Sequence, residues 1–117
     1  MQTNKLPLEG IRVADFSWFA AGPVYTEILA NHGAQVIRIE SQTRIDGLRV
    51  LHPQPEGKYG WNTGGWYNNC NASKLSFTVS MRHPKALDVV MRLIARSDIV
   101  AENYTPNTLE KWGLTYQ

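Results

Sequence analysis

The stretch that decides the fold reads Gly10-Ile11-Arg12-Val13-Ala14-Asp15-Phe16, then Ser17-Trp18-Phe19-Ala20-Ala21-Gly22-Pro23, with a second apolar segment at Val36-Ile37-Arg38-Ile39-Glu40. Residues 11–16 and 35–40 are short apolar runs, which are typical of buried strands. Pro23 suits the first turn of a helix carrying Val24, Ile28 and Leu29 at helical spacing, and Gly33 suits its left-handed end. A strand, a helix and a strand with short joints predict a right-handed βαβ unit with parallel strands.

The rest of the chain predicts an ordered excursion followed by three further elements. The excursion is rich in Gly, Pro and aromatic residues, so it needs a packing surface inside or outside this chain. In order, we expect the excursion over 41–69, a half-exposed edge strand over 76–81, a helix from Pro84 to about Arg96, a strand over 98–102, and a short helix capped by Thr105-Pro106 and ending at Trp112-Gly113.

Four strands alternating with helices predict an α/β fold, an open, doubly wound (Rossmann-like) parallel sheet with strand order 3-2-1-4. In such a sheet the ligand lies where the winding reverses, outside the carboxyl ends of strands 1 and 4. Those ends lead into Ser17–Gly22 and Asn103–Thr105. We therefore expect these two loops to form the binding site.

Length, net charge and cysteine content limit the kinds of protein that this chain can be. With 117 residues the chain makes one small domain, and a net charge of +2 from interspersed residues argues against nucleic-acid and membrane partners. The single cysteine, Cys70, excludes an intrachain disulfide and fits a reducing, cytoplasmic setting. We expect no signal peptide and no membrane span.

Individual polar residues give weak signals. A dinucleotide site would need a G-x-G-x-x-G turn, but the first turn offers Gly22 alone. We expect Asp15 to cap the following loop and helix, Glu40 to be a solvated strand-end carboxylate, and Lys74 to be a solvated surface charge, with phosphate binding as the alternative. The three histidines and Cys70 lack metal-ligand spacing, so no metal site is expected.

Several short motifs then occur in a specific order, and together they carry a family resemblance. They are Leu8–Val13, Ala21–Pro23, Leu29–Glu40, Asp46 with Arg49, Asn71–Ser76, Asp98–Tyr104 and Leu109–Leu114. This succession resembles the N-terminal part of the family III CoA transferases, the formyl-CoA and carnitine CoA transferase group. The resemblance covers the chain from about Leu6 to Gln117.

The resemblance implies that CoA or acyl-CoA lies across the same two loops. By position, the implied contacts are Phe19, Ala20, Ala21, Asn103, Tyr104 and Thr105, with Val79 and Arg82 on the adenine side and Lys111 near the phosphates. A helix N-terminus after Thr105 would favour an anion. Two positions depart from the family pattern: Ala20 stands where relatives often have glutamine, and Ser41 where some have arginine.

The resemblance also implies the activity, which is CoA transfer between carboxylic acids through an aspartyl mixed anhydride. The family aspartate is expected beyond Gln117, so residues 1–117 are interpreted as an N-terminal CoA-binding domain, an incomplete fragment that is inactive alone. Its expected partners are acyl-CoA, a carboxylic acid, and either an interlocked homodimer mate or a complementary catalytic chain. Two alternatives remain open, a 2-methylacyl-CoA racemase relative and a non-catalytic nucleotide-binding or interaction domain.

Overall fold

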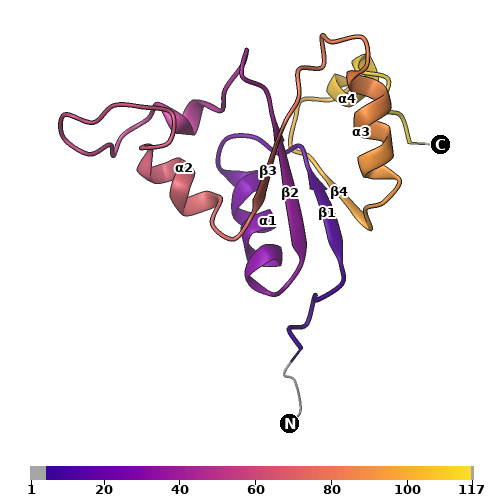
Figure 1. Ribbon diagram of the computed structural model, residues 1–117, viewed down its shortest axis with the longest axis horizontal. Coiled ribbons are helices and arrows are strands. Elements are labelled where there is room, and N and C mark those ends of the chain that lie inside the picture. The colour runs from indigo at the N-terminus through magenta and orange to yellow at the C-terminus, as the bar shows by residue number, and fades with distance from the viewer. Residues whose placement is uncertain (1–4, 117) are drawn as a thin grey trace.

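The structure, a computed structural model, describes residues 5–116 and contains the predicted parallel sheet (Figure 1). Its strand order is β3-β2-β1-β4, all pairs parallel, which confirms the predicted order. The elements are β1 (Arg12–Asp15), α1 (Ala21–Asn31), β2 (Gln35–Glu40), the 3₁₀ turn η1 (Gly47–Arg49), α2 (Gly65–Cys70), β3 (Leu75–Thr78), α3 (Ala86–Ile94), β4 (Ile99–Ala101) and α4 (Thr108–Lys111). β3 lies at the edge, as expected.

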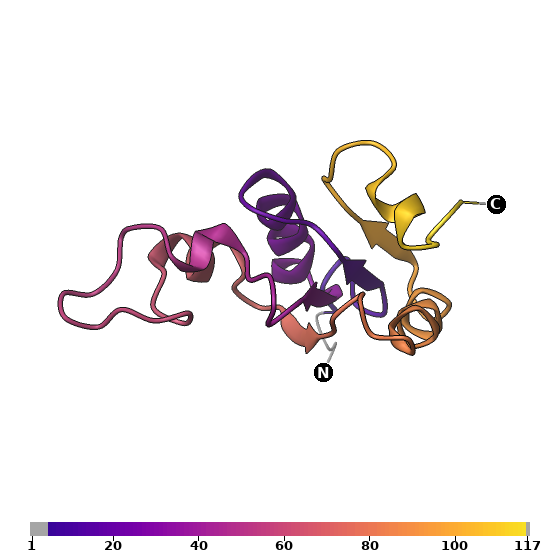
Figure 2. The same cartoon turned by 90° about the horizontal axis from the view of Figure 1, so that it is seen from above.

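The sheet is wound on both faces, so the predicted double winding is also confirmed. Successive strand residues point to opposite faces. Val13 of β1 packs with Ala30 of α1, whereas its neighbour Ala14 packs with Val90 of α3. Figure 2 shows α1 and α3 on opposite sides of the sheet. The winding therefore reverses between β1 and β4.

The excursion between β2 and β3 is ordered and has a small core of its own. Leu48, Tyr67 and Cys70 form this buried cluster, which joins η1 to α2. The segment projects from one side of the sheet (Figure 1). Tyr59 and Trp61 of this segment are 73% and 55% exposed, although the Tyr59 ring lies edge to face with His52 at 6.3 Å.

The prediction for α1 was right in its first turn, which holds Pro23, and wrong in its buried face. The helix begins at Ala21, and Val24 and Ile28 are exposed. The buried residues are Gly22, Pro23, Thr26 and Ala30, because small and polar side chains let the helix lie close to the sheet and to Asp15. None of the helices in residues 5–116 has the length and apolar character that a membrane crossing requires.

Candidate functional site

The loops after β1 and β4 are joined at the carboxyl edge of the sheet. The amide of Trp18 donates to Asn103 Oδ1 at 2.6 Å, and Asn103 Nδ2 donates back to the carbonyl of Trp18 at 2.8 Å. This two-way bond places the two predicted loops side by side. The topological expectation for where they meet is therefore confirmed.

Three backbone amides in the first half of the loop, Ser17–Phe19, are engaged by side chains. The amide of Ser17 donates to Asp15 Oδ1 at 2.9 Å, that of Trp18 to Asn103, and that of Phe19 to Asp46 Oδ2 at 3.1 Å. A glycine-rich phosphate loop leaves such amides free for the ligand. These three amides are occupied, so the segment Ser17–Phe19 does not offer them to a phosphate group.

Gly22 has a packing role in this loop. A Cβ added there would overlap Ser17 Cβ and would come within 2.9 Å of the Asn103 side chain. The glycine therefore allows the first turn of α1 to approach both loops closely. This close approach explains why the turn needs a glycine although it lacks the dinucleotide fingerprint.

Asp15 and Lys74 are a buried pair beneath the loop. Asp15 is fully buried and accepts from Thr26 Oγ1 at 2.7 Å and from Lys74 Nζ at 3.2 Å, besides the amide and hydroxyl of Ser17. Asp15 caps the following loop through Ser17, as predicted, but it does not cap the N-terminus of α1, where Ala20 has no side-chain cap. The prediction that Lys74 is a surface charge was wrong, since its ammonium also donates to the carbonyl of Pro23 at 2.8 Å, and burial lowers its pKa.

Glu40 is likewise a structural carboxylate, not a solvated one as predicted. Its side chain is 8% exposed and accepts from Arg49 Nε at 2.7 Å and from the amide of Asp46 at 2.9 Å. Burial alone would raise its pKa, but the hydrogen bonds from Arg49 and Asp46 outweigh burial and hold the pKa below its usual value. A dinucleotide-binding fold places an acid that binds the ribose at the end of this strand, and Glu40 is not available for that role.

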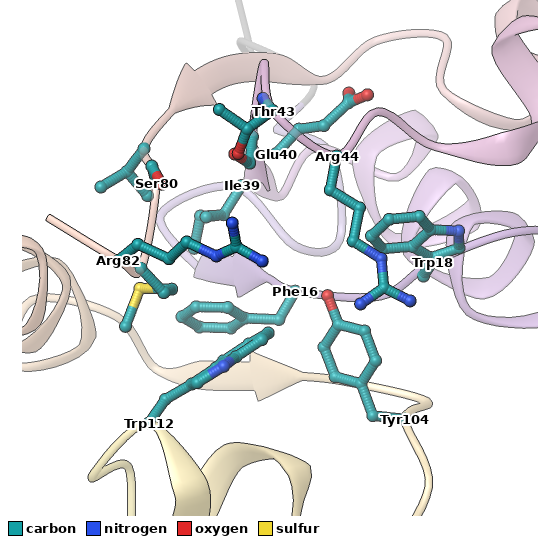
Figure 3. A pocket seen from close by; sticks show the side chains of 13 residues that line it. Phe16, Trp18, Ile39, Glu40, Thr43, Arg44, Ser80, Arg82, Tyr104 and Trp112 are labelled. Carbon is teal, nitrogen blue, oxygen red and sulfur yellow. Dashed lines mark hydrogen bonds between the residues drawn. The ribbon is translucent and has the colours of Figure 1, made fainter.

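A cavity of about 300 Å³ opens at this edge of the sheet (Figure 3). Phe16, Tyr104 and Trp112 form an aromatic wall, with the rings of Tyr104 and Trp112 edge to face at 5.3 Å. Arg82 and Arg44 reach toward the opening from different sides, and the Arg44 guanidinium lies 5.4 Å from the Trp18 ring centroid. The cavity combines flat apolar surfaces with two cations.

The charges around the cavity favour an anion. Glu40 is the acidic residue among its lining, and its carboxylate points away from the opening toward Arg49 (Figure 3). Burial raises the pKa of Tyr104 to about 12, so its hydroxyl is neutral near pH 7. An aromatic ring that carries phosphate groups matches these surfaces, because rings stack on aromatic side chains and guanidinium groups bind phosphate oxygens.

The structure brings together some of the predicted site residues. Val79, Arg82 and Tyr104 line the cavity, and Asn103 joins the loops. Phe19, Ala20 and Ala21 lie on the loop and first turn of α1. Thr105 lines a second hollow beside α4, and Lys111 is exposed on α4 and outside the cavity.

The predicted helix N-terminus after Thr105 was wrong. α4 begins at Thr108 and has four residues, and Asn107 before it adopts a left-handed conformation (φ 65°) without a side-chain cap. Asn tolerates this conformation, and the helix starts at Thr108, two residues later than the predicted start at Pro106. The expectation of a helix N-terminus directly after Thr105 that favours an anion therefore does not hold.

Sequence reasoning missed Trp18, Arg44 and the lining role of Trp112. Arg44 enters the cavity because a bridge between Ser41 and Arg44 turns the chain back after β2. The resemblance implied an arginine at the position of Ser41 in some relatives, and Arg44 supplies a guanidinium three residues later. Within residues 5–116 no group of three or more His, Cys, Asp or Glu side chains is placed to hold a metal ion.

A parallel, doubly wound sheet with a cavity at its switch point defines an α/β domain of the class in which ligands bind at this edge of the sheet. The family model of CoA-transferase family III matches residues 8–117, and the chain belongs to that family. The resemblance inferred from the motifs is confirmed.

The chain is similar to curated CoA-transferases and spans about a quarter of their length. It is 39% identical over 113 residues to the beta subunit of succinyl-CoA--L-malate CoA-transferase of Chloroflexus aurantiacus, covering 96% of this chain and 27% of that protein. It is 33% identical to human succinyl-CoA:glutarate CoA-transferase, covering 97% of this chain and 25% of that protein.

A solved structure shares the fold. The crystal structure of a CAIB/BAIF family protein from Brucella suis matches with a TM-score of 0.83 at 33% identity, covering 96% of this chain and 29% of that one. The open sheet described above is thus one part of a larger family fold.

Proposed function

We propose that residues 1–117 form the CoA-binding α/β domain of a CoA-transferase that moves CoA between carboxylic acids. The observation that carries the proposal is the cavity, in which Arg44 and Arg82 face an aromatic wall at the switch point of the sheet. Family membership and the names of the relatives support it. Those relatives are named as transferases, which supports transfer over racemisation.

The proposed ligand pose follows from the chemistry of the lining. The adenine stacks against the aromatic wall beside Val79, and Arg44 and Arg82 bind phosphate groups. The rest of CoA runs along Phe19, Ala20 and Ala21, past Asn103, Tyr104 and Thr105. Lys111, which lies on α4 outside the cavity, is proposed as a contact for the outer phosphates.

The reacting carboxylate is proposed to come from another part of the protein. None of the four aspartates of the described chain lines the cavity, and Asp15 and Asp46 are buried and hydrogen bonded. An aspartate beyond residue 117 would attack the thioester carbonyl, form the acyl-aspartyl anhydride and release CoA as the thiolate. The thiolate would then attack the aspartyl carbonyl of this anhydride, which releases the donor acid and leaves CoA as a thioester of the aspartate. The acceptor carboxylate would attack that thioester and expel the thiolate, which attacks the acceptor carbonyl of the new anhydride, forms the acceptor's CoA thioester and frees the aspartate.

This assignment of roles implies that residues 1–117 bind CoA but do not turn it over. The missing part would be supplied by the rest of a longer chain in an interlocked homodimer, or by a complementary catalytic chain. The curated alpha and beta subunits of the succinyl-CoA--L-malate enzyme show that some relatives are named as subunits. Acyl transfer catalysed by the isolated chain would contradict this proposal.

The binding proposal is tested by calorimetric titration with CoA. Arg44→Ala and Arg82→Ala each remove a guanidinium from the cavity and are expected to weaken binding roughly ten-fold or more, because a hydrogen bond to a charged group contributes about 1.5–3 kcal/mol. Arg92→Ala is the matched control, since Arg92 is exposed on α3 and pairs with Asp88. Failure of the unaltered chain to bind CoA, or equal affinity in all variants, would overturn the proposal.

A further inference from the structure

We propose that Asp46, held by the buried guanidinium of Arg38, is a positioning residue that fixes the loop Ser17–Phe19 before any ligand binds. The inference rests on the proposed CoA site, because this loop carries part of that site. Neither Asp46 nor Arg38 lines the cavity, so both act on the ligand through the loop.

Asp46 connects three separate segments at one carboxylate. It is fully buried, and its Oδ2 accepts from the amide of Phe19 at 3.1 Å and from Arg38 Nη2. Its Oδ1 accepts from the amide of Leu48 at 2.9 Å and so caps η1. The loop after β1, strand β2 and the start of the excursion therefore meet at this side chain.

Arg38 makes this meeting point rigid. Its side chain is 3% exposed, and Nε and Nη1 find no hydrogen-bond partner among the described residues. The next carboxylate, Glu40, lies 4.0 Å from Nε and is already bound by Arg49. Asp46 is thus the main counter-charge of a buried cation, and separating the pair would leave that charge uncompensated. The carboxylate is held to β2.

The backbone conformation of Phe19 is imposed by its surroundings and not by its own side chain. Its φ of 63° is unfavourable for a bulky side chain, yet its ring remains 49% exposed and gains little burial. The conformation is held by the amide bond to Asp46 and by contact with Gly47, where an added Cβ would lie 3.0 Å from the Phe19 ring. Backbone strain at a residue whose side chain stays exposed is not explained by core packing, and such strain is typical of a functional constraint.

Asp46 affects the ligand indirectly, through the position of Trp18, the residue before Phe19. Trp18 lines the cavity, and its ring contacts the Arg44 guanidinium. Because its own backbone is fixed by Asn103 and the next amide by Asp46, its ring is aimed before binding. Loss of the hydrogen bond between the Phe19 amide and Asp46 would let the loop and the Trp18 ring move. Ligand binding would then have to order them, and this entropic cost would lower the affinity for the ligand.

The test combines amide hydrogen exchange with CoA titration. Asp46→Ala leaves a buried cation that can prevent folding, so the second variant is the double change Arg38→Met with Asp46→Leu, which removes both charges together. We expect this variant to keep protected amides at Val13 and Val36, to exchange the Phe19 amide at least ten-fold faster, and to bind CoA at least ten-fold more weakly. The control, Asp88→Ala with Arg92→Ala, removes an exposed pair on α3 and should change neither measurement.

The outcomes separate this inference from the proposed function. Unchanged exchange at Phe19 would overturn the positioning role, and so would faster exchange with unchanged CoA affinity. A chain that never binds CoA would overturn the proposed function and the ligand-related part of this inference. The exchange measurement alone would then decide whether the Arg38–Asp46 pair holds the loop.

Discussion

At the scale of single residues, Lys74 carries its charge into the interior between α1 and the start of β3. Lys74→Met would leave Asp15 buried without its cation, so we expect the free energy of unfolding to fall by about 3–5 kcal/mol. Urea denaturation measures this loss. Lys58→Met is the control, because Lys58 is exposed in the excursion and should change stability by about 0.5 kcal/mol or less. Equal midpoints for both variants would contradict the structural role.

Tyr104 predicts how stability depends on alkaline pH. Burial raises its pKa from 10.0 to about 12, so the folded chain keeps this proton at pH values where the unfolded chain loses it. Its contribution to stability is complete below pH 10 and is lost as the pH rises toward 12. Tyr104→Phe should therefore show a smaller loss of stability over that range, measured by thermal unfolding at several pH values. Parallel curves for both proteins would refute this assignment.

The sequence predicts local roles of residues better than distant ones. The capping role of Asp15 follows from its place two residues before Ser17, whose amide it accepts. The partners of Lys74 and Glu40 could not be found in this way, since Lys74 reaches Asp15 across 59 residues and Tyr67 reaches Glu40 across 27. These contacts depend on how the excursion folds back on the sheet, and short motifs carry no signal for that.

At the scale of elements, the packing of α1 against the two site loops depends on Gly22. Gly22→Ala would press a methyl group against Ser17 and Asn103, so we expect a loss of about 1–3 kcal/mol in unfolding free energy from overpacking. Gly60→Ala is a matched control, because the nearest atom to an added Cβ there is 3.8 Å away. Chemical denaturation compares the two, and an unchanged Gly22→Ala variant would show that α1 shifts without cost.

The elements themselves were predictable where apolar runs define them. The strands and the double winding follow from such runs and, for β3, from polar–apolar alternation. The structure bears them out, although β3 ends at Thr78 rather than at the predicted Met81. The buried face of α1 was not predictable, because polar contacts of Thr26 and the small size of Gly22 orient the helix and leave Ile28 outside. The cavity was predictable in position, and Arg82 was among the implied contacts. Arg44 was not predictable, because it enters the cavity through the local bridge with Ser41.

At the scale of the whole molecule, apolar surface remains uncovered on two elements. Val24, Tyr25 and Ile28 are 40–52% exposed on α1, and Tyr59, Trp61 and Trp66 are 50–73% exposed in the excursion. Contiguous apolar patches on soluble proteins mark contact surfaces. The chain spans about a quarter of the length of its curated relatives, whose remaining length is ample to cover such surfaces.

This exposed surface predicts self-association of the isolated chain. Its weight-average mass in sedimentation equilibrium should rise with protein concentration, because pairing would remove the exposed rings and the α1 face from water. Val24→Glu with Ile28→Lys places a favourable i,i+4 ion pair on the same face, so it should reduce association without unfolding α1. Reversing the exposed pair on α3 by Asp88→Lys with Arg92→Glu is the control and should leave association unchanged. A mass that stays monomeric at every concentration would show that these apolar side chains remain exposed to solvent without driving association. It would contradict the prediction that the α1 face is a contact surface.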